Sequence, residues 1–248
     1  MSLMRMPSRR RVCAALAACL MTMAGCATRS PLVRQQCYNP DAQLANVLPA
    51  FEALRARGCD EATVQGGPSE CERLQREIER LAVVCPAHAP TLLANAVIAY
   101  DDQRSAEAQQ MLDIVLAQPR AYPDAAVLRA RIAIEDGNIP FARRLLTQQI
   151  KLVPDHAGLH ETHAAALYLD GNLQESRTEL TMAGALGAPR WRIAYHLGLI
   201  EETSGRNDEA TRLYQEAVTG NPGWEPAESR LKALRARSAP ATPATPRP

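Results

Sequence analysis

The chain has 248 residues, with 28 Lys and Arg against 27 Asp and Glu, and it contains only two Phe and two Trp. Residues 1–25 carry four of these cations and no acid, and the rest of the chain, with 24 Lys and Arg against 27 Asp and Glu, has no basic block, which argues against a nucleic-acid partner. The sequence also lacks an apolar run of about 18 residues, so it predicts no membrane-spanning helix.

Residues 1–25 have the order of a secretory signal: a basic segment, a short apolar run over 12–21, and small residues before a cysteine. The ending Met23-Ala24-Gly25-Cys26 resembles a bacterial lipobox. This resemblance implies that the signal is removed, that Cys26 becomes the first residue, and that it carries acyl chains such as palmitate. Ala27, which follows it, implies the outer membrane, with the protein facing the periplasm.

Two alternatives to lipidation at Cys26 stay open. Leu16-Ala17-Ala18-Cys19 fits the leucine of the box better than Met23 does, but it leaves only residues 12–18 as the apolar run. A plain signal peptide cut at a small residue would leave no lipid. Each buried CH₂ contributes about 0.8 kcal/mol, so several acyl chains would hold the protein on the membrane. Residues 26–40 would then be the lipidated start and linker.

Residues 41–88 predict a helical hairpin. Asn39 followed by Pro40 indicates the start of its first helix. Ser69 with Glu72 three positions later forms a capping box that begins the second helix. Each helix has one apolar stripe, formed in the first by Leu44, Val47, Phe51 and Leu54, and in the second by Cys71, Leu74, Ile78, Leu81 and Cys85.

Four cysteines besides Cys26 remain after the signal. An even number in an exported protein predicts disulfides. Antiparallel helices bring Cys59 and Cys71 together at the loop end and Cys37 and Cys85 together at the open end, so we expect these two pairs. Buried free thiols on the apolar stripe are the alternative. A structural zinc is disfavoured because no two of the four lie two to four residues apart.

From residue 89 to residue 222 the chain repeats itself every 34 residues. Asp136-Gly137-Asn138 returns as Asp170-Gly171-Asn172 and as Ser204-Gly205-Arg206. Positions related by this step form columns of similar residues. One column holds the small residues Ala108, Ala142, Ser176 and Ala210. Another holds the bulky residues Leu112, Leu146, Leu180 and Tyr214.

A helix–turn–helix unit with this period resembles the tetratricopeptide repeat (TPR). The last unit matches best, through Leu197-Gly198, Ala210, Tyr214, Ala217 and Pro222. The resemblance implies an all-α fold, a right-handed α-α superhelix (TPR solenoid) with about four repeats over 89–222. The disulfide-stapled hairpin would be a degenerate N-terminal cap and residues 223–237 a C-terminal capping helix. Residues 238–248 are rich in proline, and we expect a disordered tail there.

The resemblance also implies a binding groove, because the first helix of each repeat lines a concave surface that takes a peptide or a helix. Carried over to this sequence, the groove residues are Leu93, Val97, Tyr100, Asp101, Val127, Arg131, Ile134, Glu135, Glu161, Tyr168, Arg192, Tyr195, Leu199 and Glu202. This largely apolar and aromatic set suits an amphipathic helix or an extended segment with apolar anchors. An error in register would instead place some of these residues in the core.

Signals for catalysis are nearly absent, and we expect neither an enzyme nor a cofactor. His156, His160 and His163 share one helix face, a spacing that is open to a metal. Two of them fall in columns that pack between helices, so a structural role is the preferred interpretation and no metal is expected.

The sequence therefore predicts a lipid-anchored adaptor or scaffold for cell-envelope assembly, in pilus, peptidoglycan or outer-membrane machinery. It would bind a protein partner through the groove and the membrane through the lipid. The alternatives are a metal-binding protein or enzyme that uses the histidines, and a purely structural spacer.

Overall fold

The structure is a computed structural model that describes residues 37–59 and 68–238. Its described part contains eleven helices and no strand, which confirms the predicted all-α class. None of these helices has the length and hydropathy needed to cross a bilayer. The signal segment, Cys26 and the tail from residue 239 lie outside the described ranges. The chain divides into two compact units, Met1–Pro86 and Ala87–Pro248.

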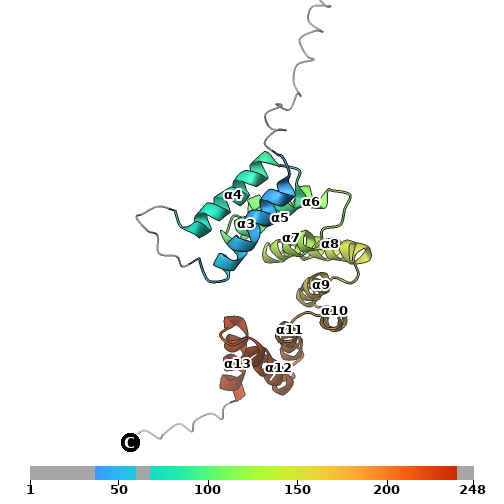
Figure 1. Cartoon of the computed structure of the whole chain (residues 1–248). Coiled ribbons are helices and arrows are strands. Elements are labelled where there is room, and N and C mark those ends of the chain that lie inside the picture. Colours follow the sequence, from blue (N-terminus) through green and yellow to red (C-terminus); the bar gives the residue numbers. More distant parts are fainter. Residues whose placement is uncertain (1–36, 60–67, 239–248) are drawn as a thin grey trace, which may run out of the picture. The chain divides into compact units, whose positions relative to one another are not determined.

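The first unit contains the predicted helical hairpin, formed by α3 (Pro40–Arg55) and α4 (Glu70–Val84) (Figure 1). The Ser69 hydroxyl accepts a hydrogen bond from the Glu72 amide at 3.1 Å, so the expected cap does start α4. The two helices pack together, with Phe51 of α3 and Ile78 of α4 among their buried residues. The apolar stripes read from the sequence therefore form the interior of this hairpin.

Both ends of the hairpin are closed by disulfide bonds. Cys37 is bonded to Cys85, with Cα atoms 5.2 Å apart. Cys59 is bonded to Cys71, with Cα atoms 5.7 Å apart. These are the two pairs expected from the antiparallel geometry, and they close loops with sequence separations of 48 and 12 residues.

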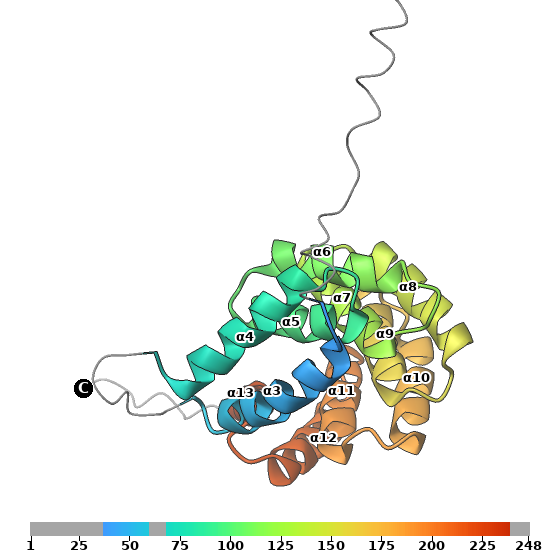
Figure 2. The same cartoon turned by 45° about the horizontal axis from the view of Figure 1, so that its top comes forward.

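The second unit is a succession of helix pairs joined by short turns (Figure 1, Figure 2). Each helix contacts the next, and α9 also contacts α7 and α11, so the first helices of successive pairs lie side by side. The helices are α5 (Ala89–Asp101), α6 (Ser105–Leu116), α7 (Pro123–Glu135), α8 (Ile139–Leu152), α9 (Ala157–Leu169), α10 (Leu173–Ala185), α11 (Arg190–Thr203), α12 (Asn207–Gly220) and α13 (Glu225–Ser238).

The turn inside each helix pair requires a left-handed residue. Gly137, Gly171 and Gly205 have φ angles of 75°, 81° and 76°, a region that glycine adopts at little steric cost. In the first pair, Gln103 takes the same position with φ 63°. The left-handed residue at this repeat position, glycine in three of the four pairs, thus marks where each first helix ends.

The small-residue and bulky columns are buried as the repeat register predicts: Ala108, Ala142, Ala210, Leu112, Leu146, Leu180 and Tyr214 are 0% exposed, and Ser176 is 1% exposed. The two helices of the last pair, α11 and α12, approach closely at Gly198. A Cβ atom built on Gly198 would lie only 2.6 Å from Cε1 of Tyr214, which leaves no room for a side chain at that position.

We expect Gly198→Ala to destabilise the second unit by about 1–2 kcal/mol. Overpacking costs about 1–3 kcal/mol, and the better helix propensity of alanine offsets up to about 1 kcal/mol of it. Gly184→Ala is a matched control, because the Cβ there would meet only Ile193 Cγ1 at 3.9 Å. That control should be neutral or stabilising by up to about 1 kcal/mol. Urea unfolding of both variants checks the difference, and equal midpoints would contradict the close packing at Gly198.

Removing the disulfides should destabilise the first unit, and more so for the longer loop. The chain-entropy argument gives about 4 kcal/mol for Cys37–Cys85 and about 3 kcal/mol for Cys59–Cys71. The double variants C37S/C85S and C59S/C71S can be compared by hydrogen exchange of α3 and α4. Peptide mapping without reductant tests the pairing directly, and a Cys37–Cys59 peptide would overturn it.

Candidate functional site

The residues predicted to line a groove lie on the first helices of the repeats, α5, α7, α9 and α11, and we call this set the first-helix face. Val127, Ile134, Tyr168, Tyr195 and Leu199 pack partly against core clusters. Three charged residues of the face, Asp101, Arg131 and Glu135, are exposed, and Glu161 is buried. The remaining residues are half-buried, namely Leu93, Val97, Tyr100, Val127, Ile134, Tyr168, Arg192, Tyr195, Leu199 and Glu202. The first-helix face therefore borders the core, and each of its half-buried apolar side chains is still partly exposed to solvent.

Two tyrosines of this face are fixed by hydrogen bonds to the next first helix. The Tyr100 hydroxyl of α5 donates to the carboxylate of Glu135 on α7. The Tyr168 hydroxyl of α9 lies 2.8 Å from the Thr203 hydroxyl of α11. Burial, with the bond to Glu135, raises the pKa of Tyr100 to about 12. Its hydroxyl therefore stays protonated at neutral pH, and the bond holds the ring in place.

Glu161 and Arg192, two of the predicted residues, are brought together as an ion pair. Glu161 is 8% exposed, and its oxygens lie 2.6 Å from Arg192 Nη2 and 3.5 Å from His196 Nε2. Burial acts to raise the pKa of Glu161, but the bonds to His196 and Arg192 outweigh it and hold the pKa below its usual value. Arg192 is therefore paired with Glu161 of α9 and is not available to bind a ligand.

Glu202 is engaged in the same way at the C-terminal end. It accepts a hydrogen bond from the Tyr214 hydroxyl at 2.9 Å and pairs with Arg237 at 2.5 Å and Arg230 at 3.6 Å. Burial acts to raise the pKa of Glu202, but the bonds to Arg237 and Tyr214 outweigh it and lower the pKa. Glu202 therefore holds α13 against α11, a structural role that sequence reasoning did not assign to it.

Tyr195 belongs to an aromatic cluster that the sequence interpretation missed. Its ring centroid lies 4.6 Å from that of Trp224 and 5.8 Å from that of Tyr214. Trp191 lies 4.8 Å from Trp224. The placement of both tryptophans, one at the start of α11 and one just before α13, was the signal that could have indicated this contact.

Arg131 differs from the other charged residues of the face. It is exposed, and no hydrogen bond or ion pair to another described residue involves it. It occupies the same repeat position as Val97 on α5, Ala165 on α9 and Leu199 on α11. The face thus combines apolar side chains with one cation that is available to a ligand.

The three histidines do not form one cluster. His160 and His163 are buried beside Glu179 of α10, at 2.6 Å and 3.2 Å, and His160 also contacts the Pro154 carbonyl at 2.8 Å. The His163 contact is an ion-pair distance without hydrogen-bond geometry. His156 instead lies 3.1 Å from Asp124. Among the described residues no group of three metal-type ligands comes together.

Comparison with known proteins agrees with this architecture. No model of a known protein family matches the chain. Tetratricopeptide repeat protein 36 of Bos taurus is 32% identical over 124 residues, a match that covers 47% of this chain and 66%, just under two thirds, of that relative.

Solved structures resemble this chain over most of its length. A thermophilic TPR protein of Thermus thermophilus aligns with a TM-score of 0.63 at 18% identity, over 77% of this chain and 98% of its own. A tetratricopeptide repeat protein of Parabacteroides merdae aligns with a TM-score of 0.60 at 15% identity, over 84% and 79%. YrrB, described as a TPR protein with an unusual peptide-binding site, gives 0.50 at 12% identity, over 79% and 99%. The chain therefore has the fold of a TPR solenoid.

Glu161→Gln should lower the stability of the second unit by about 1–2 kcal/mol at pH 7, because it removes the buried acid that pairs with Arg192, a partly solvent-screened cation, and that also contacts His196. The pKa of Glu161 is lower in the folded protein than in the unfolded chain. The stability that its ionised form contributes is therefore fully present above the unfolded-state pKa of about 4.3, and it is lost as the pH falls through the folded-state pKa.

Urea unfolding of wild type and Glu161→Gln at pH 7 and at pH 3 checks this, with the difference between them shrinking at the lower pH. Glu175→Gln, on the exposed side of α10, is the control and should change stability by less than about 0.5 kcal/mol. A difference that stays constant down to pH 3 would argue against the ion pairs.

Proposed function

We propose that this protein is a periplasm-facing lipoprotein that binds a segment of a partner protein across its first-helix face and acts as an adaptor in cell-envelope assembly. The observation that carries the proposal is the row of half-buried apolar side chains along α5, α7 and α11, together with Arg131, a cation that has no ion-pair partner among the described residues.

Such a face gains free energy when a partner covers it. Removing apolar surface from water contributes about 25 cal/mol per Å². The bonds of Tyr100 and Tyr168 to the next first helix reduce the side-chain freedom that binding would otherwise cost. The partner segment that fits carries apolar anchors and an acidic residue opposite Arg131. The peptide-binding site in the description of YrrB supports this mode of recognition for a protein of similar fold.

Export is supported by the first unit. Its two disulfides fit an oxidising compartment, and they agree with the signal-like order of residues 1–25. The lipobox-like ending at Cys26 supports a lipid anchor in the outer membrane. The proposed adaptor would then hold its partner at that membrane, in pilus, peptidoglycan or outer-membrane machinery.

A photo-crosslinking residue at Val97 or at Leu199 tests partner binding in cells. We expect the same protein to be captured from both positions and none from Gln110, an exposed residue of the second helix α6. Arg131→Glu should abolish capture, whereas Arg144→Glu, at an exposed arginine of α8, should leave it unchanged. Capture from Gln110 alone, or from no position, would favour the spacer alternative.

Metabolic labelling with palmitate tests the anchor separately. We expect Cys26→Ser to lose the label and to move the protein from the membrane fraction to the soluble fraction, because a chain without acyl groups lacks that affinity. Cys19→Ser should keep both. An unlabelled wild-type protein would refute the lipid anchor and leave the partner-binding proposal standing.

A further inference from the structure

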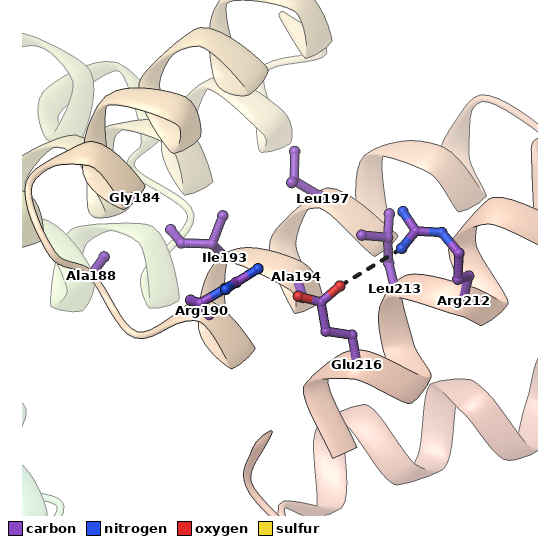
Figure 3. A pocket seen from close by; sticks show the side chains of 9 residues that line it. All are labelled: Gly184, Ala188, Arg190, Ile193, Ala194, Leu197, Arg212, Leu213 and Glu216. Carbon is purple, nitrogen blue, oxygen red and sulfur yellow. Dashed lines mark ion pairs between the residues drawn. The ribbon is translucent and has the colours of Figure 1, made fainter. Parts of the chain in front are cut away.

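A pocket of about 470 Å³ opens in the second unit among α10, α11 and α12 (Figure 3). Its apolar wall includes Ile193 and Leu197 of α11 and Leu213 of α12, and Gly184 near the end of α10 borders it. It shares no residue with the predicted groove set. We call it the Gly184 pocket.

The repeat register explains why a pocket forms at this place. Steps of 34 residues from Gly184 reach Ile150 and Val218, and a second step back reaches Leu116, all on second helices. Leu116, Ile150 and Val218 all pack against core clusters. A Cβ built on Gly184 would have only Ile193 Cγ1 within 4 Å, at 3.9 Å. The Gly184 pocket is therefore a core position whose side chain is missing in one repeat.

The charged residues that line the pocket differ in whether they have an ion-pair partner among the described residues. Arg212 pairs with Glu216 at 3.7 Å (Figure 3). It also pairs with Glu209 at 2.5 Å. Arg190, the first residue of α11, also lines the pocket, is exposed, and has no hydrogen bond or ion pair with the residues that the structure describes. An anionic group next to the apolar wall would satisfy it.

We propose that the Gly184 pocket binds a leucine or isoleucine side chain of a partner protein, with an adjacent aspartate or glutamate paired to Arg190. The neighbouring repeats indicate the size and chemistry of the occupant, because they fill the equivalent positions with Leu116 and Ile150. Arg190, which has no ion-pair partner among the described residues, indicates the charge of the neighbouring residue of the partner. This second docking site does not depend on the first-helix face.

Short peptides test the chemistry on the full chain. The amide signals of Ile193, Leu197 and Leu213 are followed by NMR during titration with acetyl-Ala-Leu-Glu-Ala-amide. We expect saturable shifts at these three residues. Replacing the leucine of the peptide by alanine should weaken binding by about tenfold or more, since burying that side chain supplies most of the gain. Replacing its glutamate by glutamine should weaken binding several-fold.

Gly184→Leu fills the pocket from within and should abolish the shifts while raising the melting temperature. Gly184→Ala adds a single carbon and should keep binding within about twofold. Arg190→Gln leaves the apolar wall intact and should remove the preference for glutamate over glutamine in the peptide. It also keeps the proposal testable if Gly184→Leu does not fold.

Several outcomes would overturn the proposal: shifts that persist in Gly184→Leu, equal affinity for the leucine and alanine peptides, or a preference for glutamate that survives Arg190→Gln. The Arg131→Glu variant separates this site from the first-helix face, because it should leave peptide binding at the Gly184 pocket unchanged. Loss of binding in Arg131→Glu would place the peptide on the first-helix face and would also contradict the second site.

Discussion

The second unit depends on how closely the two helices of a repeat can approach. Gly198 faces the ring of Tyr214 with no space for a Cβ atom, and alanine or serine occupies the small column in every repeat. Close packing at the small column fixes the rotation of each first helix about its axis, and the Gly198–Tyr214 contact does so in the last pair. Once that rotation is fixed, the same positions of α5, α7, α9 and α11 must face the same side. The first-helix face is thus a consequence of core packing rather than a separately built site.

Charge then determines which residues of that face are available to a partner. The buried acids Glu161 and Glu201 each contact an arginine from a neighbouring helix, Arg192 and Arg177, and burial alone would act against their ionised forms. Such pairs hold adjacent helices in register. They also remove Arg192 from the set of free groups, which leaves Arg131 as the charge on the face that has no partner among the described residues.

Periodicity made much of this architecture predictable from the sequence. The 34-residue step identified the buried columns and the turns, and the antiparallel hairpin identified Cys37–Cys85 and Cys59–Cys71. Side-chain contacts between repeats were not predictable. The repeat register places each residue on a face of its helix, but it does not say which residue of the next repeat it contacts. Glu161 with Arg192, and Tyr195 with Trp224, depend on distances across helices that no periodic pattern contains. The Gly184 pocket could have been found from the column that reads Leu116, Ile150, Gly184 and Val218.

The missing side chain at Gly184 has a further meaning in a chain built by repetition. Each repeat touches only its neighbours, so the loss of packing at one position is confined to one junction and does not spread along the array. In a globular domain with a single centre, the same deletion would weaken the whole fold. A modular array therefore tolerates local departures from its own consensus, and each departure is a place where a new specificity can arise without rebuilding the scaffold.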